Sequence, residues 1–131
     1  MEIINPTTWA QPKGYSNGIK ARAGQVIFIA GQVAWDEKQQ IVGREDFVRQ
    51  FDQALANVLT VLGAAGGQPG NLMKLTIFVT DKKAYQKQQK EIGQAYRRLM
   101  GRHYPAMTLV EVRGLLEDGA LIEIEGMAII E

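Results

Sequence analysis

The chain has 131 residues, of which 46% are hydrophobic and 22% charged, a composition typical of one soluble globular domain. Fifteen basic and fourteen acidic side chains leave a net charge of +1, which argues against a nucleic-acid-binding surface, because phosphate binding needs clustered Lys and Arg. No cysteine is present, so a disulfide, a Cys-ligated zinc site and a thiol nucleophile are excluded. The single histidine, His103, cannot form a multi-His metal site within one chain.

The sequence shows no targeting or membrane signal. Residues 1–10 lack a basic region followed by an apolar run, and no apolar stretch approaches the length of a membrane span. We therefore expect a cytoplasmic protein with no membrane partner.

The first part of the chain predicts irregular structure followed by a strand. Proline and glycine punctuate residues 1–24. Residues 26–34 are rich in β-branched and aromatic side chains and predict a strand. Residues 40–42 could return beside that strand as the short arm of a hairpin.

The clearest helix is predicted over residues 45–64. Its apolar side chains recur at three- and four-residue spacing: Phe47, Phe51, Leu55, Val58, Leu59 and Leu62. Glu45 and Asp46 fall in the predicted first turn, where acidic groups complement the helix dipole. Gly66 and Gly67 end the helix.

A second strand–helix pair follows. Residues 73–80 alternate between apolar and polar side chains and predict a strand. Asp81 is a predicted N-cap for a helix over residues 82–101, whose apolar stripe is weakened in the middle by Gln88 and Gln89.

The last part of the chain predicts two strands, over residues 107–112 and 120–130, separated by a turn at residues 117–119. Two long amphipathic helices and one sheet indicate an α+β fold with both helices packed on one face. The other face carries more apolar side chains than a monomer would expose, so we expect a homo-oligomer that buries it. The apolar residues that two helices cannot all cover are Ile27 or Phe28, Met107, Leu109, Met127 and Ile129.

Glu123 and Glu125 are the residues most suited to acid–base chemistry. They lie two apart on a predicted strand and therefore point to the same side, where a partly apolar setting would suit them to act as acid or base. Solvated or salt-bridged carboxylates at a sheet edge are the alternative. His103 is expected at the surface, and three arginines are expected on a solvated helix face: Arg97, Arg98 and Arg102.

Several motifs together resemble the Rid (YjgF) family, and the resemblance covers almost the whole chain. The motifs occur in the order Gly14-Tyr15-Ser16, Ile29-Ala30-Gly31-Gln32-Val33, Gln53-Ala54-Leu55-Ala56-Asn57-Val58-Leu59, Lys74 to Asp81, Tyr104-Pro105-Ala106, and Ile122-Glu123-Ile124-Glu125-Gly126-Met127-Ala128.

The resemblance implies a single Rid domain over residues 1–131 with a chorismate-mutase-like α+β fold. It implies a homotrimer in which three sheets form a central barrel, with a small-molecule cleft between adjacent subunits. The best-understood members hydrolyse enamines and imines to ketoacids and release ammonia, and they need no metal or organic cofactor.

The resemblance also assigns residues to the cleft. Glu123 matches the family glutamate that activates water, and Tyr15 matches the tyrosine at the pocket entrance. The family arginine that binds the substrate carboxylate is replaced by Met107, which has no charge and no donor. The remaining positions implied to line the cleft are Ala30, which replaces a serine, with Gly31, Pro105 and Leu109.

Met107 argues against the 2-iminoacid deaminase reaction and leaves three alternatives. The first is an imine or enamine hydrolase with a different substrate, in which Arg22 or Arg113 supplies the missing cation. The second is a metabolite-binding or regulatory trimer without turnover. The third is a stable trimer whose cleft is vestigial.

Overall fold

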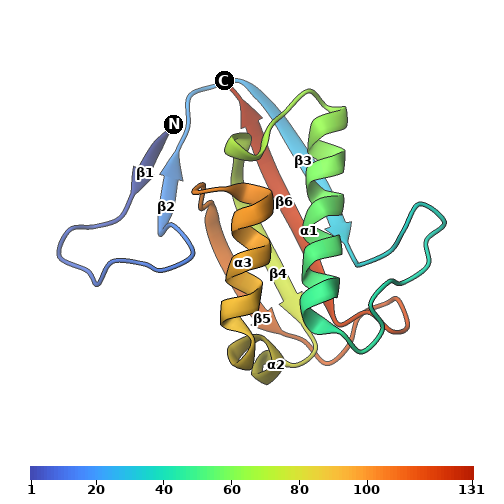
Figure 1. Cartoon of the computed structure of the whole chain (residues 1–131). Coiled ribbons are helices and arrows are strands. Elements are labelled where there is room, and N and C mark those ends of the chain that lie inside the picture. Colours follow the sequence, from blue (N-terminus) through green and yellow to red (C-terminus); the bar gives the residue numbers. More distant parts are fainter.

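A four-stranded mixed sheet carries the helices on one of its faces (Figure 1). The computed structural model describes all 131 residues. The strand order is β3-β6-β4-β5, and the strands are β3 (Gln25–Gln32), β4 (Leu72–Val79), β5 (Ala106–Glu111) and β6 (Ile122–Ile130). β4 and β5 are parallel, whereas β6 is antiparallel to both β3 and β4. The predicted α+β fold with helices on one face of a mixed sheet is confirmed.

The long helix α1 (Phe47–Ala64) begins two residues later than predicted. Asp46 is its N-cap, and the Asp46 carboxylate accepts a hydrogen bond of 3.1 Å from the Arg49 backbone N–H. Glu45 precedes the helix with a φ of 65°. The sequence predicted Glu45 and Asp46 in the first turn of the helix, but both lie before it.

The single helix predicted over residues 82–101 is wrong, because the chain forms α2 (Lys82–Lys87) and α3 (Gln89–Met100) instead. The two helices are separated by Gln88, whose φ of −116° and ψ of 25° leave the helical region. A short 3-10 helix, η1 (Pro69–Asn71), joins the end of α1 to β4. None of the helices combines the length and the apolar character that a membrane-spanning segment requires.

The core lies between the sheet and the helices. α1 contributes Phe47, Phe51, Ala54, Leu55, Val58 and Leu62, and α3 contributes Ile92, Ala95, Tyr96 and Met100. The sheet contributes Ile29, Leu72, Leu75, Ile77, Val79, Ile122, Ile124 and Ala128. The alternation of Leu75, Ile77 and Val79 in β4 and of Ile122 and Ile124 in β6 is what the period-two pattern predicted. Leu72, one residue before the predicted strand, enters the core as well because the register shifts between Leu72 and Lys74.

Residues 1–24 are more ordered than the sequence predicted. β1 (Glu2–Ile4) and β2 (Gly18–Lys20) form an antiparallel ribbon beside the main sheet (Figure 1). Strands of three residues are too short to show a recognisable period. The predicted return arm at residues 40–42 is reduced to one antiparallel bridge between Trp35 and Ile41.

Two apolar residues expected on the open face lie on the helix face instead. Met107 pairs with Leu75, and Leu109 pairs with Ile77, so both follow their partners toward the core and pack against it. The open face keeps Phe28, which is 76% exposed, together with Met127 and Ile129. The helix-free face is therefore apolar around Phe28, Met127 and Ile129, with a smaller apolar set than expected.

Candidate active site

The predicted site residues divide between the two faces of the sheet. Side chains alternate along β6, and because Ile122 and Ile124 enter the core, Glu123 points to the open face. Met107 points to the helix face at the β5 edge. One chain therefore does not bring Glu123 and Met107 into one pocket.

Glu123 is a half-buried carboxylate without a polar partner in its own chain. No hydrogen bond or salt bridge joins its side chain to another residue, although the Glu123 backbone pairs in register with Phe78 of β4. A Cβ atom on Gly31 would lie 2.6 Å from Oε1 of Glu123, so the glycine makes room for the carboxylate. Ala30 and Gly31 form a β-bulge, since the register shifts between Ile29 and Gln32. The structure thus brings Gly31 and Glu123 together, with exposed Ala30 beside them.

Gln50 supports the start of the strand that carries Glu123. It is fully buried, and its amide nitrogen donates hydrogen bonds to the carbonyls of Gly43 (3.2 Å) and Gly119 (2.9 Å). Its Oε1 accepts a hydrogen bond of 2.8 Å from the Leu121 N–H, two residues before Glu123. Gln50 was not predicted from the sequence. The available signal was a polar residue one turn after Asp46, flanked by helix positions that enter the core.

A second group of predicted site residues lies where the N-terminal loop meets β5. Ser16 is buried, and its hydroxyl donates a hydrogen bond of 2.5 Å to the Tyr104 carbonyl. The Ser16 N–H donates to the carbonyl of buried Pro105 at 3.0 Å. Gly14 has a φ of 78°, a left-handed conformation that favours glycine. These bonds place Tyr15, which is 42% exposed, beside the edge of β5.

Met107 lines a pocket of about 330 Å³, which we call the Met107 pocket. This volume suits a small metabolite. Its walls include Lys13, Tyr85, Tyr96, Arg97, Tyr104 and Met107. No carboxylate lines it, so its charge comes from Lys13 and Arg97. Arg97 is exposed on α3, as expected for a solvated helix face, and it also lines this pocket.

Three tyrosines line the pocket: Tyr85, Tyr96 and Tyr104. The rings of Tyr96 and Tyr104 stack with centroids 5.1 Å apart and planes 7° from parallel. The Tyr96 hydroxyl donates a hydrogen bond of 2.5 Å to the His103 carbonyl. Burial raises the pKa of Tyr85, and burial together with Tyr104 raises the pKa of Tyr96. Both phenols are therefore neutral at physiological pH, and the Tyr85 hydroxyl has no hydrogen-bond partner within the chain to compete with a ligand.

His103 is half-buried rather than a surface residue. One of its ring nitrogens lies 2.6 Å from the Leu72 carbonyl oxygen, which joins the end of α3 to the start of β4. This contact gives His103 a structural role.

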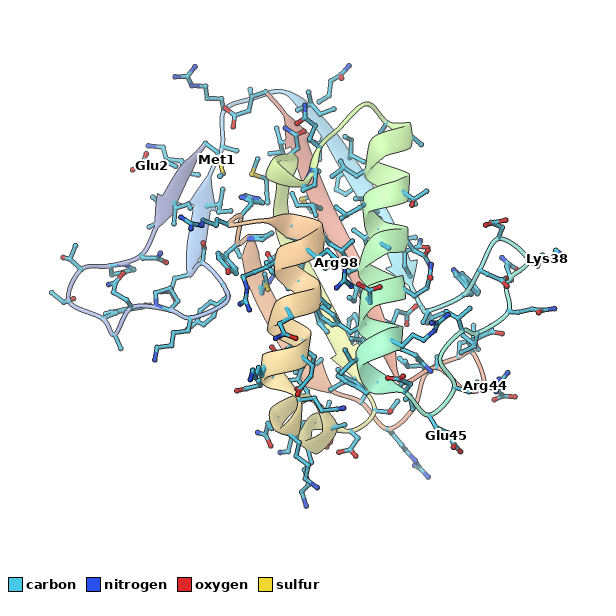
Figure 2. The ribbon with its side chains drawn as sticks, viewed as in Figure 1. Met1, Glu2, Lys38, Arg44, Glu45 and Arg98 are labelled. Carbon is cyan, nitrogen blue, oxygen red and sulfur yellow. The ribbon has the colours of Figure 1, made fainter.

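Neither arginine proposed as a replacement cation lines the Met107 pocket. Arg22 lies in a hollow beside Met1 and Glu2, near the chain termini. Arg113 is exposed beyond the end of β5. Figure 2 shows Arg98 between α3 and α1, where its guanidinium pairs with Asp52.

A larger hollow of about 480 Å³ lies where α1 and α2 begin, lined by Glu45, Asp46 and Asp81 among others. It contains none of the predicted site residues. The carboxylates of Asp46 and Asp81 already cap their helices. No group of three or more His, Asp or Glu side chains in the chain is arranged to hold a metal ion.

Comparison with known proteins identifies the family. The family model described as endoribonuclease L-PSP matches residues 8–130. A RutC family protein of Pyrococcus horikoshii is 35% identical over 128 residues, which cover 97% of this chain and 96% of that protein. The chain belongs to the Rid (YjgF) family.

Two other Rid relatives bear on the reaction and the fold. The 2-iminobutanoate/2-iminopropanoate deaminase of Salmonella typhimurium is 33% identical over 109 residues, covering 81% of this chain and 80% of that enzyme. A solved Rid structure from Yersinia pestis, described as a protein of unknown function, superposes with a TM-score of 0.88 at 32% identity. That similarity covers 98% of both chains. The Rid fold is thereby established, while the reaction has to be argued from the site.

Proposed function

We propose that this Rid protein is a homotrimer that hydrolyses the C–N bond of a small imine or enamine in clefts between its subunits, with Glu123 acting on water. The observation that supports the proposal is the state of Glu123. Its half-buried carboxylate has no partner in its own chain, sits against Gly31 and faces a side of the sheet that no helix covers.

A ring of three copies would bring the two groups of site residues together. β3 and β5 are the edges of the sheet. In a closed ring built from one repeated contact, the β5 edge of each copy borders the β3 edge of the next. Gly31 and Glu123 lie toward the β3 edge, whereas Tyr15 and Met107 lie at the β5 edge. The cleft at each seam would therefore contain a carboxylate from one copy and an apolar, tyrosine-rich pocket from its neighbour.

The reaction follows from these groups. Glu123 accepts a proton from water as the water oxygen bonds to the imine carbon, giving a carbinolamine. Proton transfer to nitrogen then allows the C–N bond to break, so that imine and water yield a carbonyl compound and ammonia. The neutral phenol of Tyr85 is a suitable hydrogen-bond donor to a bound ligand. These steps call for no cofactor. The deaminase named for 2-iminobutanoate and 2-iminopropanoate, a relative at 33% identity, supports this reaction class.

Met107 separates this protein from a 2-iminoacid deaminase. A thioether cannot replace the two parallel hydrogen bonds that an arginine makes to a carboxylate. Met107 instead provides a flexible apolar contact at the base of the pocket. The same substitution favours the second candidate function, a trimer that binds a metabolite without turnover.

The proposal is tested by following ammonia release from imines generated in place by an amino-acid oxidase. We expect the native protein to accelerate hydrolysis of some imines but not of simple 2-iminoacids, and Met107→Arg to gain activity on 2-iminoacids. Saturable ligand stabilisation with no turnover on any imine would favour the binding function. Rapid 2-iminoacid hydrolysis by the native protein would contradict the role assigned to Met107.

The trimer is tested separately through Phe28, the most exposed aromatic residue of the open face. We expect light scattering to give three times the protomer mass for the native chain. Phe28→Asp should yield monomers, because the substitution puts a charge into the proposed apolar interface. Phe28→Leu is the matched control and should remain trimeric. A monomeric native chain at micromolar concentration would contradict both the trimer and the shared cleft.

A further inference from the structure

The Met107 pocket has a cation on the wall opposite the strand that carries Met107. Arg97 belongs to α3, which covers the sheet, and it lines the same pocket as Met107. Its guanidinium lies over Gly93, one turn earlier on the same helix. A Cβ atom on Gly93 would lie 3.3 Å from Nη1 of Arg97 and 3.9 Å from both Cζ and Nη2. The missing side chain at Gly93 thus leaves the guanidinium room to lie along the helix at the pocket wall.

The guanidinium of Arg97 is available to a ligand. It forms no salt bridge and no hydrogen bond within the chain, in contrast to Arg98, which pairs with Asp52 of α1 (Figure 2). No acidic residue lines the pocket, and Lys13 adds a second positive charge. A glycine inside a helix costs about 1 kcal/mol relative to alanine. Gly93 therefore lowers the stability of helix α3, but it leaves room for the guanidinium of Arg97.

The positions of Arg97 and Met107 determine which way round a ligand would bind in the pocket. Arg97 is exposed and lies at the mouth of the pocket, whereas Met107 is half-buried and packs against the core. An anionic group would meet Arg97 at the mouth, and an apolar segment would lie along Met107 and the tyrosines. A 2-iminoacid does not match this arrangement, because its carboxylate is attached directly to the reacting carbon with no apolar segment between them.

We propose that Arg97 is the anion-binding residue of this pocket, and that it selects ligands whose carboxylate is separated from the C–N bond by an apolar spacer. The inference rests on the proposed function for the identity of the reacting bond. The planar guanidinium suits a carboxylate, to which it can donate two parallel hydrogen bonds. The substrate class is an imine or enamine of a ketone with a distant carboxylate, and the product is the corresponding keto acid.

The test measures binding of product analogues and needs no turnover. Three five-carbon ketones serve as probes in calorimetry and thermal-shift titrations: 4-oxopentanoate, 2-oxopentanoate and neutral 2-pentanone. We expect 4-oxopentanoate to bind most tightly. Arg97→Gln should weaken its binding about tenfold or more, and Arg97→Lys should recover only part of the loss. Arg98→Gln is the matched control on the same helix and should change affinity by less than about twofold.

The results separate this inference from the proposed reaction. Arg97-dependent binding of 4-oxopentanoate would support the inference even if no imine were hydrolysed, in which case only the proposed reaction fails. Unchanged affinity in folded Arg97→Gln would overturn the inference, as would tighter binding of 2-oxopentanoate. A folded native protein that binds none of the carboxylates would overturn it as well.

Discussion

Glu123→Gln should lower the turnover number for imine hydrolysis by roughly 100- to 10,000-fold, the range expected for loss of a general base. The amide has nearly the shape of the carboxylate but cannot accept the proton of water. Ligand binding should change little, because the proposed anion and apolar contacts are made by residues of the Met107 pocket, which does not include Glu123. Steady-state kinetics of ammonia release, with calorimetry on a product analogue, separate the two effects.

Two further variants show whether the loss of turnover is specific to the Glu123 carboxylate. Glu125→Gln removes a carboxylate from the same side of β6, two residues along and exposed, and should leave turnover nearly unchanged. Gly31→Ala should reduce turnover while the protein stays folded, because its Cβ would displace the Glu123 carboxylate, which lies at the end of a flexible side chain. Equal losses in Glu123→Gln and Glu125→Gln would contradict a specific role for Glu123.

Gln50→Leu should lower the free energy of unfolding by about 3 kcal/mol. Leucine has a similar volume but forms none of the three hydrogen bonds made by the Gln50 amide. The carbonyls of Gly43 and Gly119 and the Leu121 N–H would lose these partners, and each unsatisfied buried group costs about 1–3 kcal/mol. Urea denaturation at a fixed protomer concentration measures the change, because unfolding of an oligomer depends on concentration.

Gln94→Leu is the matched control for this substitution. Gln94 is exposed on α3 and makes no side-chain hydrogen bond, so its replacement should change stability by less than about 0.5 kcal/mol. Because Gln50 holds the segment leading into Glu123, Gln50→Leu should also lower turnover at temperatures where the protein is still folded. Equal stability of the two variants would show that the Gln50 hydrogen bonds are energetically unimportant.

The sequence by itself determined the elements with a clear period. The apolar repeat of α1 and the alternation along β4 and β6 follow directly from 3.6- and 2-residue geometry, and they predict the mixed α+β fold. The family motifs indicated Rid membership, which comparison with known proteins confirmed. Alternation along β6 also predicts that Glu123 and Glu125 share one side of the sheet, because strand geometry decides the direction of their side chains.

Only the tertiary structure decided how these residues meet. Met107 follows Leu75 to the helix face through strand register, which no local pattern in β5 reveals. The non-helical Gln88 separates α2 from α3. Arg97 lies on α3 and lines the Met107 pocket. Gln50 reaches Gly119 across 69 residues of sequence. Local periodicity reports which side of an element is apolar, whereas contacts between distant segments depend on how the elements pack, and the candidate site is made of such contacts.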